Sequence, residues 1–353
     1  MSSEKILIIG GGPAGIEAAK GIASLGYKAI LVDKRDKLGG MPDSAQYAAL
    51  TPDFRDTDEA LNEMTAPLLN NENVDLKFNT LVTGVEGTVG NFKVKAINLG
   101  NEITIECGAV ILCTGFKHFD PGRETQKYGY YEHDDVITLT DAEKMLKQHT
   151  FVKPSNGEKP SRVCFIQCVG SRDRQIGNEY CSKVCCGVAS KQSIEIRRLL
   201  PDCKVYIFYI DMRMYGYWEN EIYWVAQEEH KVNYIKGIAT EIVKKGDRLL
   251  VKGEDTTMRR PMEVDMDVVI LSVGMEPSDG TQEMAVLFGV KQNKFGFIET
   301  TGGALDTVST TVEGVYAAGA CTGPADLEDS VSQGGLAAMK AIGIVRSKAM
   351  ATA

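Results

Sequence analysis

Long apolar runs are absent from this chain of 353 residues. No continuous apolar stretch approaches the roughly 18 to 20 residues that a membrane-spanning helix requires, so direct membrane insertion is not expected. The amino-terminal sequence MSSEKILIIGGG also lacks the layout of a signal peptide. Together, these two absences predict a cytoplasmic protein.

Basic charge and histidine are also scarce. The formal net charge is −9 and the sequence shows no basic stripe, which argues against nucleic acid as a partner. The histidines are scattered and form no metal-binding motif. We expect ordinary surface or linker positions for all four of them: His118, His133, His149 and His230.

Two familiar cysteine arrangements are missing. The chain has no C-x2-C-x2-C run of the ferredoxin type. No cysteine follows Gly39-Gly40, where Met41-Pro42-Asp43 stand instead, so a redox-active dithiol is not expected there. Nine cysteines without an export signal favour a reducing compartment, where thiols serve metals or redox chemistry.

The first residues form a nucleotide-binding pattern. An apolar strand, Ile6–Ile9, leads into GGGPAG, which satisfies G-x-G-x-x-G. Gly10 permits a tight turn, and Gly12 lets the backbone approach a pyrophosphate. Gly15 lets the following helix pack closely on the strand.

The continuation of this pattern supports a dinucleotide site. A helix is predicted from Pro13 to about Ser24, and its first N–H groups and dipole favour phosphate. A second strand then ends on Asp33, which is placed to hydrogen-bond ribose hydroxyls. Strand, glycines, helix, strand and acid occur in the correct order, which makes the prediction specific.

The chain also contains a degenerate internal repeat. Three strands of the first unit have counterparts of similar composition, in the same order, further along the chain. The pairs are Lys5–Gly10 with Arg162–Cys168, Lys28–Asp33 with Lys204–Asp211, and Ala109–Phe116 with Val268–Met275. Strand–helix–strand order twice over predicts two parallel, Rossmann-like α/β units.

The repeat is nested. After the second unit come another apolar strand, Gly314–Gly319, and a helix with a capping box at Ser330 and Gln333. We therefore expect a discontinuous dinucleotide-binding domain, residues 1–118 and 276–353, with a second domain inserted at 162–275. Residues 119–161 resemble neither sheet and are expected to form an ordered linker, with a short helix opened by a capping box over Thr140–Glu143.

Four cysteines stand where a second glycine fingerprint is expected. Cys168, Cys181, Cys185 and Cys186 are spaced C-x12-C-x3-C-C. Four thiolates close in sequence can hold an iron–sulfur cluster, which needs soft anionic ligands. Zinc prefers C-x2-C knuckles, and a disulfide between the two adjacent cysteines would be strained and leave the other two unexplained. Buried structural cysteine stays open for any single one, and it is the interpretation for Cys107, Cys113, Cys164 and Cys203.

The second unit has lost its phosphate-binding glycines. Gln167–Arg172 cannot bring its backbone to a pyrophosphate as G-x-G-x-x-G does. Asp211 remains where a ribose-binding acid would stand. Direct reduction by NAD(P)H is therefore not expected, and electrons are expected to pass to and from partner subunits.

Three segments resemble the two-dinucleotide flavoproteins, the superfamily of glutathione and thioredoxin reductases. They are Gly39-Gly40, the Thr114-Gly115 turn and Gly314–Gly319. The resemblance implies a thioredoxin-reductase-like architecture that binds FAD in the first domain. With the glycine motif, it implies FAD contacts at Gly10, Gly12, Pro13, Ala14, Gly15, Asp33, Lys34, Gly40, Met41, Val82, Thr114, Gly115, Gly319, Ala320, Ser330 and Val331.

The chain departs from that superfamily at one point. The late segment usually ends in Gly-Asp, whose aspartate holds the ribityl chain, but here Gly319-Ala320-Cys321 stands instead. That contact is either lost or supplied by another group, with Asp326 and Asp329 as candidates. Cys321 fits either packing or a place near the flavin.

FIQCVGSRD and YCSKVCC, at 165–173 and 180–186, closely resemble the A-type subunit of heterodisulfide reductase. The linker YGYYEHDDVITLTDAEKML and the late segment AAGACTGPADLEDSVSQGG do so as well. The resemblance implies a [4Fe–4S] cluster bound by Cys168, Cys181, Cys185 and Cys186 close to FAD, a homodimer, and B- and C-type partner subunits. Without ferredoxin-like cysteine runs, the chain looks like the short form in heterodisulfide-reductase-like complexes of sulfur-metabolising microbes.

The function implied is electron transfer between FAD and the cluster, with sulfur chemistry on other subunits. Three alternatives stay open: an NAD(P)H-dependent flavoprotein reductase, the flavin subunit of a quinone-interacting, membrane-linked complex, and a flavin-binding scaffold with a structural metal. Lys191 fits either flavin tuning or a solvated helix position. Arg172 fits either a charge beside the cluster or an exposed loop.

Overall fold

The computed structural model describes residues 3–352, apart from the side chains at positions 125, 126 and 352. The chain divides into two compact units, each discontinuous in sequence. Unit 1 combines the chain up to Ser44 with Asp58–Lys117 and the chain from Glu276 onward. Unit 2 combines Ala45–Thr57 with His118–Met275.

Unit 1 is built on a five-stranded parallel sheet with the order β17-β7-β1-β2-β3. Its strands are β1 (Ile6–Ile9), β2 (Ala29–Val32), β3 (Val74–Lys77), β7 (Ala109–Leu112) and β17 (Val315–Ala317). The three central strands are uninterrupted runs of buried aliphatic residues. Such runs are expected where both faces of a parallel sheet are covered.

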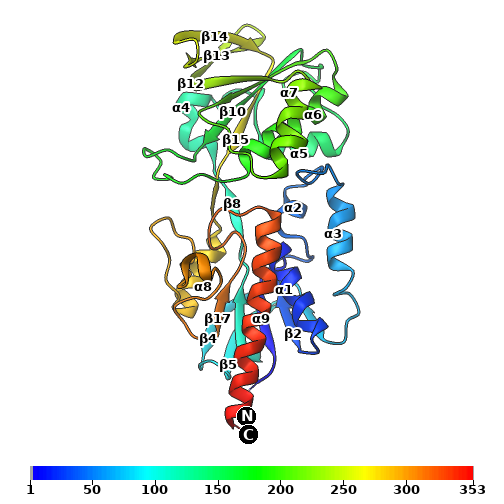
Figure 1. Ribbon diagram of the computed structural model, residues 1–353, viewed down its shortest axis with the longest axis vertical. Coiled ribbons are helices and arrows are strands. Elements are labelled where there is room, and N and C mark those ends of the chain that lie inside the picture. Colours follow the sequence, from blue (N-terminus) through cyan, green and yellow to red (C-terminus); the bar gives the residue numbers. More distant parts are fainter. Residues whose placement is uncertain (1–2, 353) are drawn as a thin grey trace. The chain divides into compact units, whose positions relative to one another are not determined.

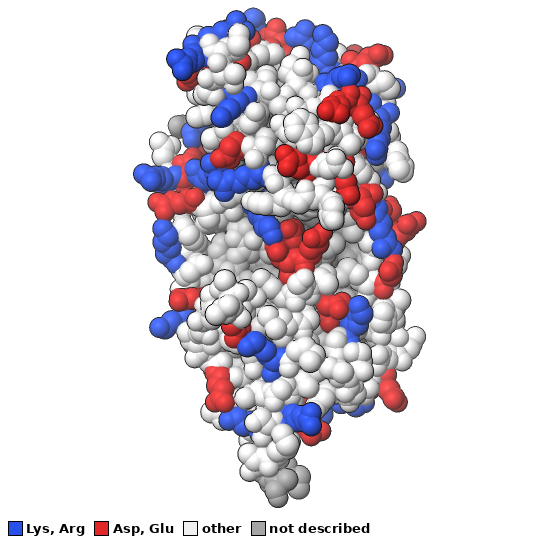
Figure 2. Space-filling model, viewed as in Figure 1, with Lys and Arg blue, Asp and Glu red and all other residues white. Residues whose placement is uncertain are grey.

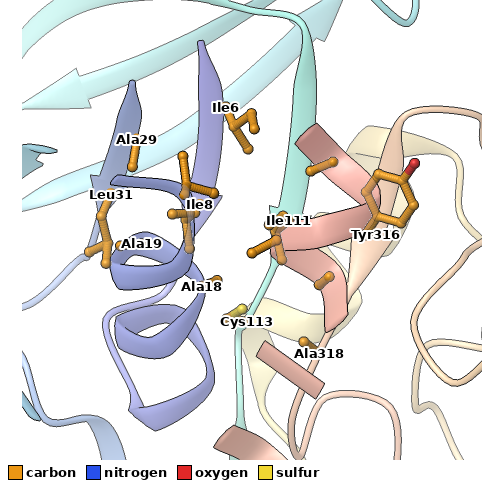
Figure 3. Packing of buried hydrophobic residues seen from close by; sticks show 14 of the residues in the cluster. Ile6, Ile8, Ala18, Ala19, Ala29, Leu31, Ile111, Cys113, Tyr316 and Ala318 are labelled. Atoms are coloured by element: carbon orange, nitrogen blue, oxygen red, sulfur yellow. The ribbon is translucent and has the colours of Figure 1, made fainter. Parts of the chain in front are cut away.

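Two helices of unit 1, α1 (Pro13–Ser24) and α9 (Leu327–Thr352), pack against each other beside this sheet (Figure 1). The close view of the core shows Ile8 of β1 facing Ala18 and Ala19 of α1 (Figure 3). All three side chains are inaccessible to solvent. Small alanines let the helix approach the sheet closely, which holds the start of α1 at the end of β1.

Unit 1 also contains a three-stranded antiparallel sheet and three further helices. The sheet has the order β4-β5-β6. Its strands are β4 (Thr80–Glu86), β5 (Phe92–Asn98) and β6 (Asn101–Cys107), and the helices are α2 (Gly40–Ser44), α3 (Thr57–Thr65) and α8 (Asp279–Phe288). Buried and exposed residues alternate along β5, as expected for a sheet with one face on the core.

Unit 2 is built on a seven-stranded sheet with the order β14-β13-β12-β11-β10-β15-β9. Its strands are β9 (Val136–Thr138), β10 (Arg162–Val169), β11 (Lys204–Tyr209), β12 (Asn233–Lys245), β13 (Arg248–Asp255), β14 (Arg260–Met266) and β15 (Val268–Val273). The pairings from β12 to β9 are parallel, and β13 and β14 continue the sheet in antiparallel pairing.

The two sheets repeat one strand order. In unit 1, β3-β2-β1-β7-β17 corresponds to β12-β11-β10-β15-β9 in unit 2. The prediction of two parallel, Rossmann-like units is therefore confirmed. The last strand has a different origin in each copy, because β17 follows β7 along the chain whereas β9 precedes β10.

The position of β9 corrects the expected linker. The sequence predicts that residues 119–161 lie outside both sheets, but β9 pairs with β15 and closes the sheet of unit 2. Helix α5 (Leu139–Lys147) follows it and packs against α6 (Cys185–Leu199). A strand of three residues is too short to show the periodicity that identifies longer strands.

Two helix starts also differ from the sequence prediction. The capping box of α5 uses Thr138 and Asp141, two residues earlier than the predicted pair. Helix α9 starts at Leu327, ahead of the predicted box. There Asp326 and Asp329 accept hydrogen bonds from each other's backbone N–H at 2.8 and 3.2 Å, the reciprocal pattern of a capping box.

The remaining short elements connect these parts. They are β8 (Phe116–His118), β16 (Met275–Pro277), α4 (Thr125–Tyr128), α7 (Val225–Glu228), 3-10 turns at Pro121–Glu124 and Gly303–Leu305, and a π-helical turn at Glu219–Trp224. Within the described residues, no helix is both long enough and apolar enough to cross a membrane. Basic and acidic side chains are interspersed over the face drawn in Figure 2.

Candidate functional site

The glycine turn of unit 1 can only be built from glycine at two positions. Gly10 has φ +113°, and a Cβ atom there would lie 2.2 Å from the carbonyl oxygen of Cys113. A Cβ on Gly15 would lie 1.9 Å from the carbonyl oxygen of Gly10. Both close approaches hold the amino terminus of α1 against the ends of β1 and β7, as the fingerprint predicts.

Gly12 and Gly40 form a cradle of bare backbone. A Cβ on Gly40, which has φ +60°, would lie 2.6 Å from the Cα of Gly12. Gly12 caps the start of α1 without any side-chain hydrogen bond, and Pro13 follows in the first turn. The first N–H groups of the helix therefore face a site without side chains, which suits a pyrophosphate.

Asp33 lies beside this turn, at the end of β2. Its carboxylate accepts hydrogen bonds from the backbone N–H of Gly11 at 2.6 Å and of Arg35 at 2.7 Å. Arg35, which sequence reasoning missed, donates in turn to the carbonyl oxygen of Gly40 at 2.8 Å and pairs with Asp43. Burial acts to raise the pKa of Asp43, but hydrogen bonds and charge from Lys37 and Arg35 outweigh it and lower that pKa.

Two further turns lie at the carboxyl ends of β7 and β17, on the edge of the sheet where β1 ends. The carbonyl oxygen of Thr114 accepts a hydrogen bond from Ser278 at 2.8 Å, and its hydroxyl contacts that of Thr281 at 2.7 Å. The N–H of Gly319 donates to the Gln333 side chain at 2.7 Å. In open α/β sheets this edge is where ligands bind.

The other predicted FAD contacts differ in accessibility. Lys34 is exposed, Met41, Gly115 and Val331 are half-buried, and Ala14 and Ala320 are buried. The Val82 side chain packs into the apolar core. The Ser330 hydroxyl donates to the carbonyl oxygen of Asp326 inside α9. Asp326 and Asp329 cap the start of that helix.

In unit 2, a folded loop brings Cys168 and Cys181 back together. Cys168 lies near the end of β10 and has φ +65°. Ser171 and Ser182 lie close in sequence to these two cysteines. The Ser182 hydroxyl donates a hydrogen bond to the Ser171 hydroxyl at 3.2 Å. The N–H of Lys183 also contacts the Cys181 sulfur at 3.3 Å. The strand and turn predicted for this segment are confirmed.

Cys185 and Cys186 are the first two residues of α6, where the helix dipole favours negative charge. Burial, then the thiols of Cys186, Cys168 and Cys181, raise the pKa of Cys185 well above its ordinary value. Burial likewise raises the pKa of Cys186 to about 11. Cys168 and Cys181 are thus close enough to Cys185 and Cys186 for the charges of the thiols to act on one another.

These thiols do not form a ready binding site for a single metal ion. Across the part of the chain that the structure describes, no group of three or more His, Cys, Asp or Glu side chains is arranged to hold one ion. The other cysteines are all buried. Among them, the Cys321 thiol donates to the carbonyl oxygens of Leu112 and Ala318 at 3.3 and 3.2 Å.

The chain's own side chains occupy the remnant of the second nucleotide site. Glu124 accepts a hydrogen bond from the N–H of Gly170 at 3.1 Å, which puts a carboxylate where a phosphate would be bound. A Cβ on Gly170 would lie 2.1 Å from the ring of Phe119. Asp211 forms ion pairs with Arg172 and Arg213. Glu124 and Phe119 are distant in sequence from β10, and sequence reasoning missed both.

Lys191 is buried and paired with carboxylates. Its side chain is 1% exposed, and its ammonium lies 2.7 Å from Glu143 and 3.3 Å from Glu195. It also donates to the carbonyl oxygen of Ala49 at 2.8 Å. The expected helix position is right, but the lysine is enclosed by carboxylates and backbone of unit 2, which corrects the prediction of a solvated side chain.

Residues 4–341 match the pattern of the pyridine nucleotide-disulphide oxidoreductase family. The match covers nearly the whole chain, so the chain belongs to this family and is an oxidoreductase. Family membership also supports FAD as the dinucleotide of unit 1.

Curated relatives indicate which type of oxidoreductase subunit the chain resembles. The chain is 31% identical to the A-type subunit of the H(2):CoB-CoM heterodisulfide,ferredoxin reductase of Methanothermobacter thermautotrophicus, over 98% of this chain and 64% of that protein. It is also 31% identical to the iron-sulfur A-type subunit of the CoB–CoM heterodisulfide reductase of Methanocaldococcus jannaschii, over 93% of this chain and 62% of that protein. The predicted resemblance to this type of subunit is confirmed. The chain spans less than two thirds of the length of these relatives.

Solved structures agree on the architecture. Thioredoxin reductase of T. acidophilum has a TM-score of 0.65 at 20% identity, over 99% of this chain and 100% of that chain. Thioredoxin reductase of Lactococcus lactis gives the same score and identity, over 98% and 100%. The thioredoxin-reductase-like fold predicted from the sequence is therefore confirmed.

Proposed function

We propose that the protein is the FAD- and [4Fe–4S]-containing electron-transfer subunit of a heterodisulfide-reductase-like complex. FAD binds to the glycine cradle of unit 1, and the cluster is held by Cys168, Cys181, Cys185 and Cys186 of unit 2. FAD and the cluster supply redox chemistry. The protein's own residues bind the two groups, exclude water and set the charge around them.

The observation that carries this proposal is the gathering of the four thiols at the start of α6. Three separate segments contribute them, and a folded loop of unit 2 brings the segments together. In a [4Fe–4S] cluster each thiolate binds a different iron, so the sulfurs surround a cube instead of meeting at one ion. The absence of a single-ion site among the described residues is therefore compatible with a cluster.

The cysteine environment also suits thiolate ligands. Without metal, burial raises the pKa of the Cys168, Cys185 and Cys186 thiols, which favours their protonated form. Metal ligation requires the thiolate, so iron would replace the protons. The dipole of α6 and the cationic Arg172 would then compensate the negative charge of the bound cluster.

NAD(P)H as a direct electron donor is the main alternative, because the family description names pyridine nucleotides. The Glu124 carboxylate on the N–H of Gly170 argues against it, since it would repel a phosphate at that turn. The Phe119 ring against Gly170 also fills space beside the turn. We therefore propose protein partners as donor and acceptor.

The names of the relatives support the setting of this function. Those relatives are named as A-type subunits of heterodisulfide reductases, so we propose B- and C-type partner subunits, with sulfur chemistry on those partners. We also propose a homodimer, a cytoplasmic location and a role in sulfur metabolism. A quinone-interacting, membrane-linked complex is the alternative setting, which copurification with a membrane protein would favour.

The test is to measure iron and acid-labile sulfide on protein purified without oxygen, with electron paramagnetic resonance before and after dithionite reduction. The proposal expects about four iron and four sulfide per chain, a reduced-cluster signal, and loss of both in Cys185→Ser. Cys203→Ser is the matched control, because Cys203 is equally a buried free cysteine but lies outside the set. Flavin without iron, even after reconstitution, would overturn the cluster assignment.

A further inference from the structure

Two charged residues next to Cys168 are joined in a fixed geometry. The Arg172 guanidinium contacts Asp211 at two points, with Nη1–Oδ1 at 2.5 Å and Nη2–Oδ2 at 3.1 Å. The Arg172 side chain is 20% exposed and that of Asp211 47% exposed. A two-point contact between guanidinium and carboxylate fixes both the position and the plane of the arginine.

The same guanidinium lies near Cys168, where its positive charge acts to lower the pKa of the thiol against the larger effect of burial. The backbone between the two residues is ordered. Arg172 has φ +57°, and its N–H donates to the carbonyl oxygen of Tyr180 at 2.9 Å. The N–H of Ser171 donates to the carbonyl oxygen of Cys168 at 3.2 Å. These hydrogen bonds fix the turn that joins Cys168 to Arg172.

Asp211 occupies the place in unit 2 that Asp33 occupies in unit 1. Asp33 follows β2 and accepts the N–H of Gly11 in its glycine turn. Asp211 follows β11, the counterpart of β2, and accepts the arginine of the turn that replaced the second glycine turn. The carboxylate that holds the glycine turn in one copy of the fold thus holds an arginine in the other.

We propose that Asp211 is a positioning residue that holds the Arg172 guanidinium in place beside Cys168, so that the charge of Arg172 raises the reduction potential of the cluster. This inference rests on the proposed function. Each electron added to the cluster increases its negative charge by one. A cation beside a ligand sulfur stabilises the more negative state, so its loss makes reduction harder.

The test is a redox titration of the full, anaerobically purified protein, with the reduced-cluster resonance as readout. Arg172→Gln should shift the midpoint potential to lower values. In the Asp211→Ala background, where Arg172 is no longer held, the same substitution should produce a much smaller shift. Arg172→Lys keeps the charge but not the two-point contact, so its midpoint potential should fall between those of wild type and Arg172→Gln. If Arg172→Gln loses its iron, Arg172→Lys is used in its place.

Arg174→Gln is the control for charge, because Arg174 is exposed two residues further along the chain; its midpoint potential should stay at the wild-type value. An unchanged potential in Arg172→Gln would overturn this inference, as would an equal shift with and without Asp211. Both results leave the proposed function intact. Wild-type protein without iron and sulfide would instead overturn the proposed function, and this inference with it.

Discussion

The ammonium of Lys191 lies 2.7 Å from a carboxylate oxygen of Glu143, and the two side chains are only 1% and 4% exposed. The second oxygen of Glu143 accepts the N–H of Ala48 at 2.8 Å. Lys191 also donates to the carbonyl oxygen of Ala49. One buried ion pair therefore anchors residues 45–57 in unit 2. In the sequence, this segment is flanked on both sides by residues of unit 1.

The first prediction concerns this pair. Lys191→Met should reduce the free energy of unfolding of unit 2 by about 3 to 5 kcal/mol, because it leaves the Glu143 charge buried without its partner. Urea unfolding followed by tryptophan fluorescence measures this directly, since both tryptophans, Trp218 and Trp224, belong to unit 2.

The control is the double variant Lys191→Met with Glu143→Leu. Replacing both charges with apolar groups of similar size removes the unpaired charge of Glu143, although Glu195 still lacks its lysine partner, so this variant should be more stable than Lys191→Met alone. A double variant that is less stable than the single one would contradict this account of the pair. It would show that the hydrogen bond from Ala48 to Glu143 contributes more than the buried charges.

The second prediction concerns pH. Burial lowers the pKa of His118 to about 4, against the charge of Asp141, which raises it. In the unfolded chain the ordinary value of about 6.5 applies. Because the pKa of His118 is lower in the folded protein than in the unfolded chain, neutral His118 contributes its full stabilisation of the fold above about pH 6.5. This contribution is lost as pH falls toward 4.

Between about pH 6.5 and pH 4, the free energy of unfolding should fall by at most about 3 kcal/mol because of His118. The Tyr47 hydroxyl lies 3.2 Å from His118 Nε2, and His118→Gln, whose amide can either donate to or accept from that hydroxyl, should flatten the pH dependence between those limits. Urea midpoints of the two proteins, measured by tryptophan fluorescence across the window, provide the comparison. Parallel pH profiles for wild type and variant would refute the assignment.

Local sequence signals were enough to predict most of unit 1. The strand Ile6–Ile9, the helix Pro13–Ser24 and the glycine turn between them occur as predicted. Each depends on residues near one another in the chain, since a glycine fingerprint, an apolar run and a helical period are all local. The repeat was recognisable for the same reason, because matching strands keep similar sequences.

The features that sequence reasoning missed depend on contacts between distant segments. Strand β9 has only three residues and is defined by its pairing with β15. Lys191 has the helical position of a solvated residue, but Ala49 and Glu143 enclose it. Glu124 accepts a hydrogen bond from the N–H of Gly170, which is 46 residues later in the sequence. None of these contacts leaves a periodic or motif signal, so a single sequence does not reveal them.

The third prediction concerns electron donors. NADH and NADPH should leave the flavin of the purified protein oxidised, whereas dithionite should bleach it. Glu124 provides the reason, because its carboxylate takes up the Gly170 N–H that a phosphate would need. Flavin absorbance under anaerobic conditions is the readout. Rapid bleaching by either nucleotide would favour the NAD(P)H-dependent reductase instead.

The last prediction separates flavin binding from folding. A Cβ on Gly12 would lie 3.6 Å from the nearest atom outside its own neighbours, the Cα of Gly40, which is ordinary contact. Gly12→Ala should therefore fold, but its methyl group would occupy the space where a pyrophosphate approaches the backbone.

We expect Gly12→Ala to be purified with much less flavin than wild type and with an unchanged far-ultraviolet circular dichroism spectrum. Gly343→Ala is the matched control, because a Cβ there meets nothing within 4 Å and Gly343 is an exposed position of α9. That variant should keep its flavin and gain up to about 1 kcal/mol of stability, since alanine favours a helix interior over glycine. Full flavin occupancy in Gly12→Ala would mean that the dinucleotide does not use this turn.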